Sequence, residues 1–135
     1  MALIVWDKRL ETGHARIDEQ HQALVDIFNH LHGAMQQGKG KAEVEGILVF
    51  LKDYTVTHFA MEEGLMAEHP YTGADRHRQI HADLVGQVEE LKERYHQGQT
   101  TLTLPVMNFL EDWLLRHIQE EDYQFVQELK AQGIR

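Results

Sequence analysis

Apolar side chains recur along this chain in alternating steps of three and four residues, the spacing of one buried face of an α-helix. We predict helices over residues 17–37, 41–65, 74–96 and 104–130. Gly38 and Gly98 are expected to end the first and third helices, and Pro70 the second, because the residue before a proline disfavours helical geometry. Asp75 and Thr103 are the candidate N-caps of the third and fourth helices.

Amphipathic helices of this number and length, joined by short loops, are typical of an up-down-up-down four-helix bundle. The sequence therefore predicts an all-α protein with one domain over residues 1–135. Residues 1–15 do not continue any apolar stripe. We expect them to form an N-terminal arm that packs across the bundle.

Composition narrows the classes of function. The 22 acidic and 13 basic residues give a net charge of −9, which argues against nucleic acid as a partner. The absence of cysteine excludes disulfides, thiol catalysis and cysteine-ligated metal. The opening apolar run over residues 2–6 is too short for a signal sequence or a membrane span, so we expect a soluble, cytoplasmic protein.

Ten histidines are the unusual feature of the composition. Ionisable residues interrupt the apolar stripe of every predicted helix, where a buried charge is costly unless it is paired or binds a metal. Residues four apart on a helix point in similar directions, so two pairs could each chelate one ion. The residues in the stripes are His21, His58, Glu62, His77, His81 and His117, of which His58 with Glu62 and His77 with His81 are the pairs.

Asp122 is a seventh candidate with an irregular spacing. It follows His117 by five residues, which is about 140° around an ideal helix. Both side chains can face the core if they reach toward it, or if the helix widens locally into a π-bulge.

Each of these residues taken alone also has an ordinary explanation. His77 and His81 could be a surface pair, His21 a hydrogen-bonded core histidine, and the two carboxylates parts of solvated faces. Five histidines and two carboxylates at one level of one core are too many ligands for a single zinc ion. They suit two octahedral first-row ions, although the ligands alone do not separate iron from manganese. Heme is an alternative that does not require the chelate pairs.

The segments 17–21, 58–63, 77–81 and 117–122 resemble, in order, the four ligand motifs of the hemerythrins, and residues 5–7 and Gly13 extend the likeness. The resemblance is closest to the single-domain bacterial hemerythrins. It implies a non-heme centre of two iron ions with an oxo or hydroxo bridge. One iron would take His77, His81 and His117, the other would take His21 and His58, and Glu62 and Asp122 would bridge both. The second iron would then be one ligand short, leaving a position for dioxygen.

The resemblance also implies an apolar pocket around that position. The matching residues are Leu24, Phe59, Trp113, Leu114 and Ile118. Several lie beside or one turn from a candidate ligand, but ordinary core packing explains them equally well. The remaining histidines, which are His14, His30, His32, His69 and His96, are expected to be surface residues.

The function expected from the sequence is reversible dioxygen binding, for storage or for delivery to an oxygen-consuming enzyme, by a monomer without catalytic residues. Only two carboxylates are available to the centre, whereas di-iron oxidases of bundle type use four. An oxygen or redox sensor is an alternative, disfavoured because no output domain is apparent. A di-iron redox enzyme acting on peroxide or nitric oxide is another, and for it we find no acid–base pair beyond the ligands.

Overall fold

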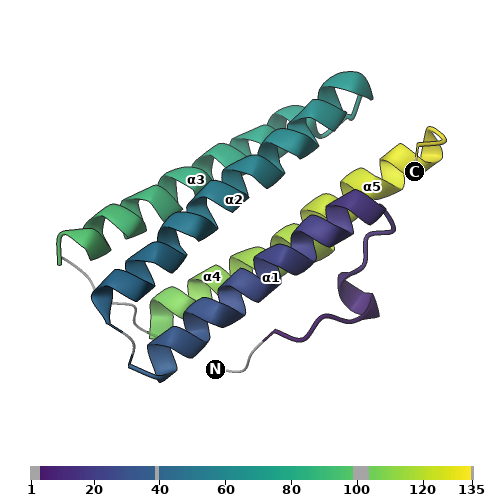
Figure 1. Ribbon diagram of the computed structural model, residues 1–135. Helices are drawn as coiled ribbons and strands as arrows, with labels where there is room; N and C mark the ends of the chain where they lie inside the picture. The colour runs from purple at the N-terminus through teal and green to yellow at the C-terminus, as the bar shows by residue number, and fades with distance from the viewer. Residues whose placement is uncertain (1–3, 39, 99–103, 135) are drawn as a thin grey trace.

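The structure, a computed structural model, describes residues 4–38, 40–98 and 104–134. Consecutive helices run in opposite directions and form a four-helix bundle, with no strand among the described residues (Figure 1). The helices are α1 (Ala15–Gln36), α2 (Lys41–Glu68), α3 (Ala74–His96) and α4 (Leu104–Arg116), which continues through a π-helical segment, η2 (His117–Asp122), into α5 (Tyr123–Ala131). The predicted all-α bundle is confirmed.

The helix ends differ from the predictions at three places. Helix α1 begins at Ala15 because the His14 ring nitrogen accepts a hydrogen bond from the backbone N–H of Ile17 at 3.2 Å. Helix α2 continues to Glu68, immediately before the residue that precedes Pro70. The N-cap of α3 is a glycine, Gly73, so Asp75 was wrong as a cap and lies instead in the first turn. The predicted cap Thr103 lies outside the described residues.

The N-terminal arm runs back along α1 and includes one turn of 3-10 helix, η1 (Lys8–Leu10) (Figure 1). The Asn29 side chain holds its start, accepting from the Ile4 N–H at 3.0 Å and donating to the Ile4 carbonyl at 2.7 Å. At the other end, the Asp18 carboxylate accepts bonds from the N–H and hydroxyl of Thr12. The arm is therefore attached to α1 at Asp18 and at Asn29, on either side of His21 in the sequence.

The buried apolar residues form two clusters along the bundle. The large cluster fills the end where α1 meets α2 and includes Leu31, Leu48, Leu84 and Leu110. The small cluster fills the opposite end and consists of Ile17, Met66, Phe125, Val126 and Leu129. Between these two clusters lies a layer of buried ionisable side chains, which we call the polar layer and whose members are His21, His58, Glu62, His77, His81, His117 and Asp122.

Two histidines expected at the surface are buried. His14 is buried as the cap of α1, and His32 packs against the Phe28 ring with ring centroids 6.5 Å apart. The surface interpretation of both residues was wrong, because neither a capping role nor contact with a ring one turn away follows from position outside the main apolar stripe.

Candidate metal centre

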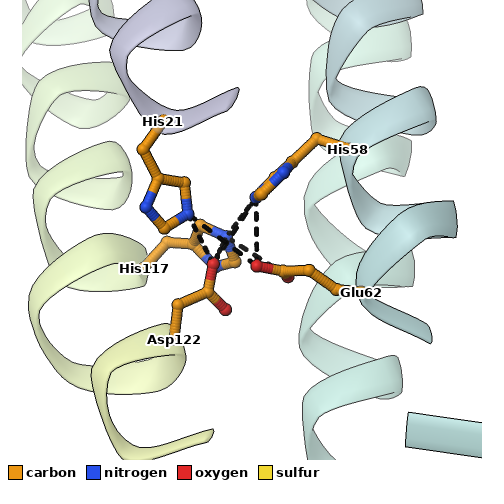
Figure 2. A group of neighbouring side chains, drawn as sticks. All are labelled: His21, His58, Glu62, His117 and Asp122. Atoms are coloured by element: carbon orange, nitrogen blue, oxygen red, sulfur yellow. Dashed lines mark hydrogen bonds and ion pairs between the residues drawn. The ribbon is translucent and has the colours of Figure 1, made fainter. Parts of the chain in front are cut away.

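The structure brings all seven residues of the polar layer together, with none more than 2% exposed. Every helix of the bundle contributes: α1 supplies His21, α2 and α3 supply two residues each, and η2 supplies the last two. Figure 2 shows five of these side chains pointing toward one another between the helices. Spacing along each helix had placed the residues on inward faces, and the bundle brings those faces to one level.

The Asp122 carboxylate lies between histidines of different helices. Its Oδ2 atom is 2.6 Å from His21 Nε2 and 2.7 Å from His117 Nε2. Its Oδ1 atom is 2.9 Å from His77 Nε2. The two oxygens of one carboxylate therefore face two different groups of histidines.

Glu62 has the same arrangement on the opposite side. Its Oε2 atom lies 3.1 Å from His58 Nε2, and its Oε1 atom lies 3.1 Å from His81 Nε2. Within each of two five-residue groups, one ligand atom per residue lies within 4.8 Å of all the others. Glu62, Asp122 and His117 belong to both groups, which are completed by His21 and His58 in one and by His77 and His81 in the other.

The π-helical segment explains how Asp122 joins the site. His117 and Asp122 are its first and last residues, and both are buried. In a regular α-helix they would diverge by about 140°, and the wider π turn removes part of this difference. The widening that the five-residue spacing suggested is confirmed.

Burial controls the charge of the histidines in the protein without metal. It lowers the pKa of His21, His58 and His117 from the ordinary value of 6.5. Burial, reinforced by the charges of His117 and His77, lowers the pKa of His81 to about 2. These imidazoles are therefore neutral at pH 7, which is the form that binds a metal ion.

The two carboxylates shift in opposite directions. Burial and the neighbouring Asp122 raise the pKa of Glu62 well above its ordinary value of 4.5. Burial acts in the same direction on Asp122, but His117 and the hydrogen bonds it receives hold the pKa of Asp122 well below 3.8. Burial and mutual repulsion thus act against ionisation of Glu62, whereas the histidines around Asp122 favour its ionised form.

Several inward-facing polar atoms of the cluster lie at ion-pair distance from one another but make no hydrogen bond of suitable geometry in the protein. They are both carboxylate oxygens of Glu62, the Nε2 atoms of His77 and His81, and Oδ1 of Asp122. In addition, the Nε2 atoms of His58 and His117 face each other at 3.3 Å. Buried polar atoms are rarely left unpaired, and imidazole and carboxylate groups suit first-row metal ions. The donor set therefore fits a pair of cations.

The sequence did not reveal two residues that contact the outer ring nitrogens of polar-layer histidines. The Gln20 amide oxygen lies 2.7 Å from His58 Nδ1, and a Glu63 carboxylate oxygen lies 3.1 Å from His81 Nδ1. Both contacts join different helices, so periodicity within one helix carries no signal for them. Only the neighbouring positions of Gln20 and His21, and of Glu62 and Glu63, hint at proximity to the site.

The apolar residues predicted around the site divide into two groups. Leu24, Trp113 and Leu114 line a narrow apolar cavity of about 20 Å³, together with Thr55 and residues of the large cluster. This volume is little more than one water molecule requires. Phe59 and Ile118 are buried but do not line that cavity. Phe59 instead stacks on the His81 ring, with ring centroids 3.7 Å apart, and Trp113 stacks on the His117 ring, with centroids 5.2 Å apart.

Among the described residues, no helix combines the length and apolar character needed to cross a membrane.

Comparisons with known proteins agree with this geometry. The family model described as the hemerythrin HHE cation binding domain matches residues 12–129. Bacteriohemerythrin of Pseudomonas aeruginosa strain PAO1 is 38% identical over 126 residues, covering 93% of this chain and 81% of that protein. Bacteriohemerythrin of Methylococcus capsulatus is 32% identical, covering 90% of this chain and 93% of the relative.

A more distant relative and a crystal structure extend the likeness. Myohemerythrin-1 of Phascolopsis gouldii is 28% identical, with 90% of each chain covered. A crystal structure of wild-type hemerythrin superposes with a TM-score of 0.86 at 31% identity, covering 93% of this chain and 97% of that one. With the family model matched over most of its length and a bundle of the same fold, this chain belongs to the hemerythrin family.

Proposed function

We propose that this protein binds dioxygen reversibly at a non-heme di-iron centre and so stores oxygen or delivers it to an oxygen-consuming enzyme. The observation that carries the proposal is the position of Glu62 and Asp122, each of which faces both groups of histidines. This arrangement supports two bridged ions rather than one. The relatives named hemerythrin, myohemerythrin and bacteriohemerythrin support the identity of the bound gas.

In this proposal the residues have distinct roles. His77, His81 and His117 would hold one iron, His21 and His58 would hold the other, and Glu62 and Asp122, which belong to both groups, would be shared by the two. His117 lies within reach of both ions, and its assignment to the first rests on the resemblance. The iron pair supplies the electrons for reversible dioxygen binding and, at the ion with fewer protein ligands, the position for it.

The surrounding side chains protect this position. Leu24 and Leu114 are buried, and the Trp113 ring covers one face of His117. Such a lining excludes water and anions, which would otherwise compete for the metal and favour its ferric form. We propose that Phe59 and Ile118 complete the apolar shell behind the ligands rather than contact the gas.

The groups present support the proposal that the protein binds dioxygen without catalysis. All the buried carboxyl groups of the polar layer are assigned to the metal, which leaves no separate general acid or base there. The curated relatives are likewise named as hemerythrins and not as enzymes. We propose that the chain has no catalytic residues, and that it works as a cytoplasmic monomer, which cell fractionation and sedimentation would test.

The test is iron content followed by absorbance spectra of the ferrous protein as air is admitted and then removed under argon. We expect two irons per chain and a visible band that appears with air and disappears under argon over repeated cycles. Irreversible conversion to the ferric state, with release of superoxide or peroxide, would instead support a redox enzyme or a sensor. Protein without iron would refute the di-iron assignment.

A further inference from the structure

The five histidines of the polar layer differ at their outer ring nitrogens. All five direct Nε2 toward the carboxylates. The Nδ1 atoms of His21, His77 and His117 are buried without a hydrogen-bond partner. Of the five, only His58 and His81 have a side-chain hydrogen-bond partner at Nδ1. These two histidines therefore differ from the other three in their outer contacts.

The partners of these two ligands differ in charge. His58 meets the neutral amide oxygen of Gln20 at 2.7 Å, and His81 meets the carboxylate of Glu63 at 3.1 Å. Both partner atoms are hydrogen-bond acceptors, so each ring must donate its Nδ1–H and present the lone pair of Nε2 to the centre. A carboxylate at this position also increases the electron donation of the imidazole more than an amide does.

The cations nearest to Glu63 pair with other residues, so His81 is the hydrogen-bond partner of its carboxylate. Its side chain is 36% exposed and lies in a surface groove between α2 and α3. The two cations that line the groove have other partners: Lys52 pairs with Glu89 at 3.3 Å and Arg78 with Asp75 at 3.5 Å. The parallel ring of Phe59, 3.7 Å from His81, covers the face of the imidazole, while Glu63 holds its edge.

We propose that Glu63 is a positioning residue that fixes the ring tautomer of His81 and makes the centre electronically unequal. The histidine on one side of the centre, His81, has the charged partner Glu63, whereas His58 on the other side has only the neutral Gln20. Glu63 therefore stabilises the ferric state at the end of the centre that is richer in histidine. This inference rests on the proposed di-iron function, which it deepens.

The decisive variants exchange charge while keeping an acceptor oxygen. Glu63→Gln retains a hydrogen-bond acceptor, and Gln20→Glu places a carboxylate beside His58 in the reciprocal way. Glu90→Gln is the matched control, because Glu90 is an exposed residue of α3 about 14 Å along the helix from His81. Iron content and circular dichroism establish that each variant remains folded and loaded.

The first measurement is the reduction potential of the loaded centre, determined by spectroelectrochemical titration under argon. We expect Glu63→Gln to reduce the preference for ferric over ferrous iron about tenfold, which raises a one-electron potential by about 59 mV. Gln20→Glu should lower the potential, and Glu90→Gln should leave it unchanged. Equal potentials for Glu63→Gln and Glu90→Gln, with iron retained, would overturn the inference.

The second measurement needs no iron. In the ¹⁵N-labelled protein without metal, we expect the His81 ring to carry its proton on Nδ1 in the wild type and in Glu63→Gln, and to become a mixture of tautomers in Glu63→Leu. A mixed tautomer in the wild type would overturn the positioning role. Failure of the wild type to release dioxygen would refute the proposed function while leaving both of these measurements decisive for Glu63.

Discussion

The large apolar cluster and the polar layer are both fully buried, yet they contribute to the molecule in opposite ways. In the large cluster, side chains such as Leu31 and Leu48 are buried among other apolar residues, and their burial stabilises the bundle. In the polar layer, buried carboxylate and imidazole atoms make no hydrogen bond of suitable geometry, which costs stability in the protein without metal. The large cluster therefore stabilises the fold, whereas the polar layer provides side chains for metal ions at a cost in stability.

The largest expected effect comes from removing a shared ligand. Asp122→Ala should abolish iron binding, because the Asp122 carboxylate faces His21, His77 and His117 at once. Metal analysis of the purified protein measures this loss. Asp112→Ala on the preceding helix removes an exposed carboxylate and should retain two irons per chain. If Asp122→Ala retained two irons, the bridging assignment would be wrong.

Acid should destabilise the metal-free protein strongly through the polar layer. The lowered pKa values of His21, His58, His81 and His117 mean that the unfolded chain takes up protons below about pH 6.5 while the folded protein does not. Each such histidine removes up to about 1.4 kcal/mol of stability per pH unit. The raised pKa of Glu62 opposes this loss of stability above pH 4.5, because the folded protein keeps a proton there that the unfolded chain releases. This single group acts against four histidines.

Urea unfolding of the protein freed of metal by a chelator, at a series of pH values, measures this dependence. The free energy of unfolding should fall steadily as the pH decreases from 7 toward 5. A constant value over that range would show that the histidines are not buried in the neutral form.

A cavity in the large apolar cluster should have a smaller effect and a different kind of consequence. Leu48→Ala removes a fully buried side chain and should cost about 2–5 kcal/mol of stability. The iron content of the folded variant should remain two per chain, because Leu48 does not belong to the polar layer. Val49→Ala, at an adjacent residue that is 43% exposed, is the control, with an expected change below about 0.5 kcal/mol.

The smallest expected effect lies at the boundary between the two regions. Trp113→Ala removes the ring stacked on His117 and opens the apolar cavity to water. The variant should retain its iron but convert to the ferric state a few-fold faster in air, as followed by absorbance. Phe109→Ala, one turn earlier on α4 and 43% exposed, should match the wild type. An unchanged rate of conversion to the ferric state in Trp113→Ala would show that the Trp113 ring does not protect the centre.

Local periodicity predicted most of the bundle because each helix has one apolar stripe. Helix α3 begins and ends where its stripe and Gly98 indicated. The same reasoning left a widened turn at Asp122 as one of two possibilities, since the five-residue spacing from His117 conflicts with a regular helix, and the π-helical segment η2 is the one observed. The clustering of six polar-layer residues could be predicted because they interrupt apolar stripes, and an interruption is visible in the sequence alone.

Contacts between helices could not be predicted in this way. The hydrogen bonds that attach the arm to α1 join Ile4 to Asn29, 25 positions away. The Nδ1 partners of His58 and His81 are 38 and 18 positions away from them. Position within a helix fixes the face on which a side chain lies, whereas its neighbour across the bundle depends on the relative placement of two helices.

The separation of the ligands along the chain has a consequence for local opening. His21 and Asp122 are 101 residues apart, yet His21 Nε2 lies 2.6 Å from Asp122 Oδ2. Of the other candidate ligands, four lie on the intervening helices α2 and α3, and His117 lies on η2 with Asp122. A metal pair held by them would act as a clasp that closes several large loops at once, and fraying of any one helix past its ligand would break it. In the loaded protein, slow amide hydrogen exchange should therefore proceed through one shared opening of all four helices rather than through independent fluctuations of each.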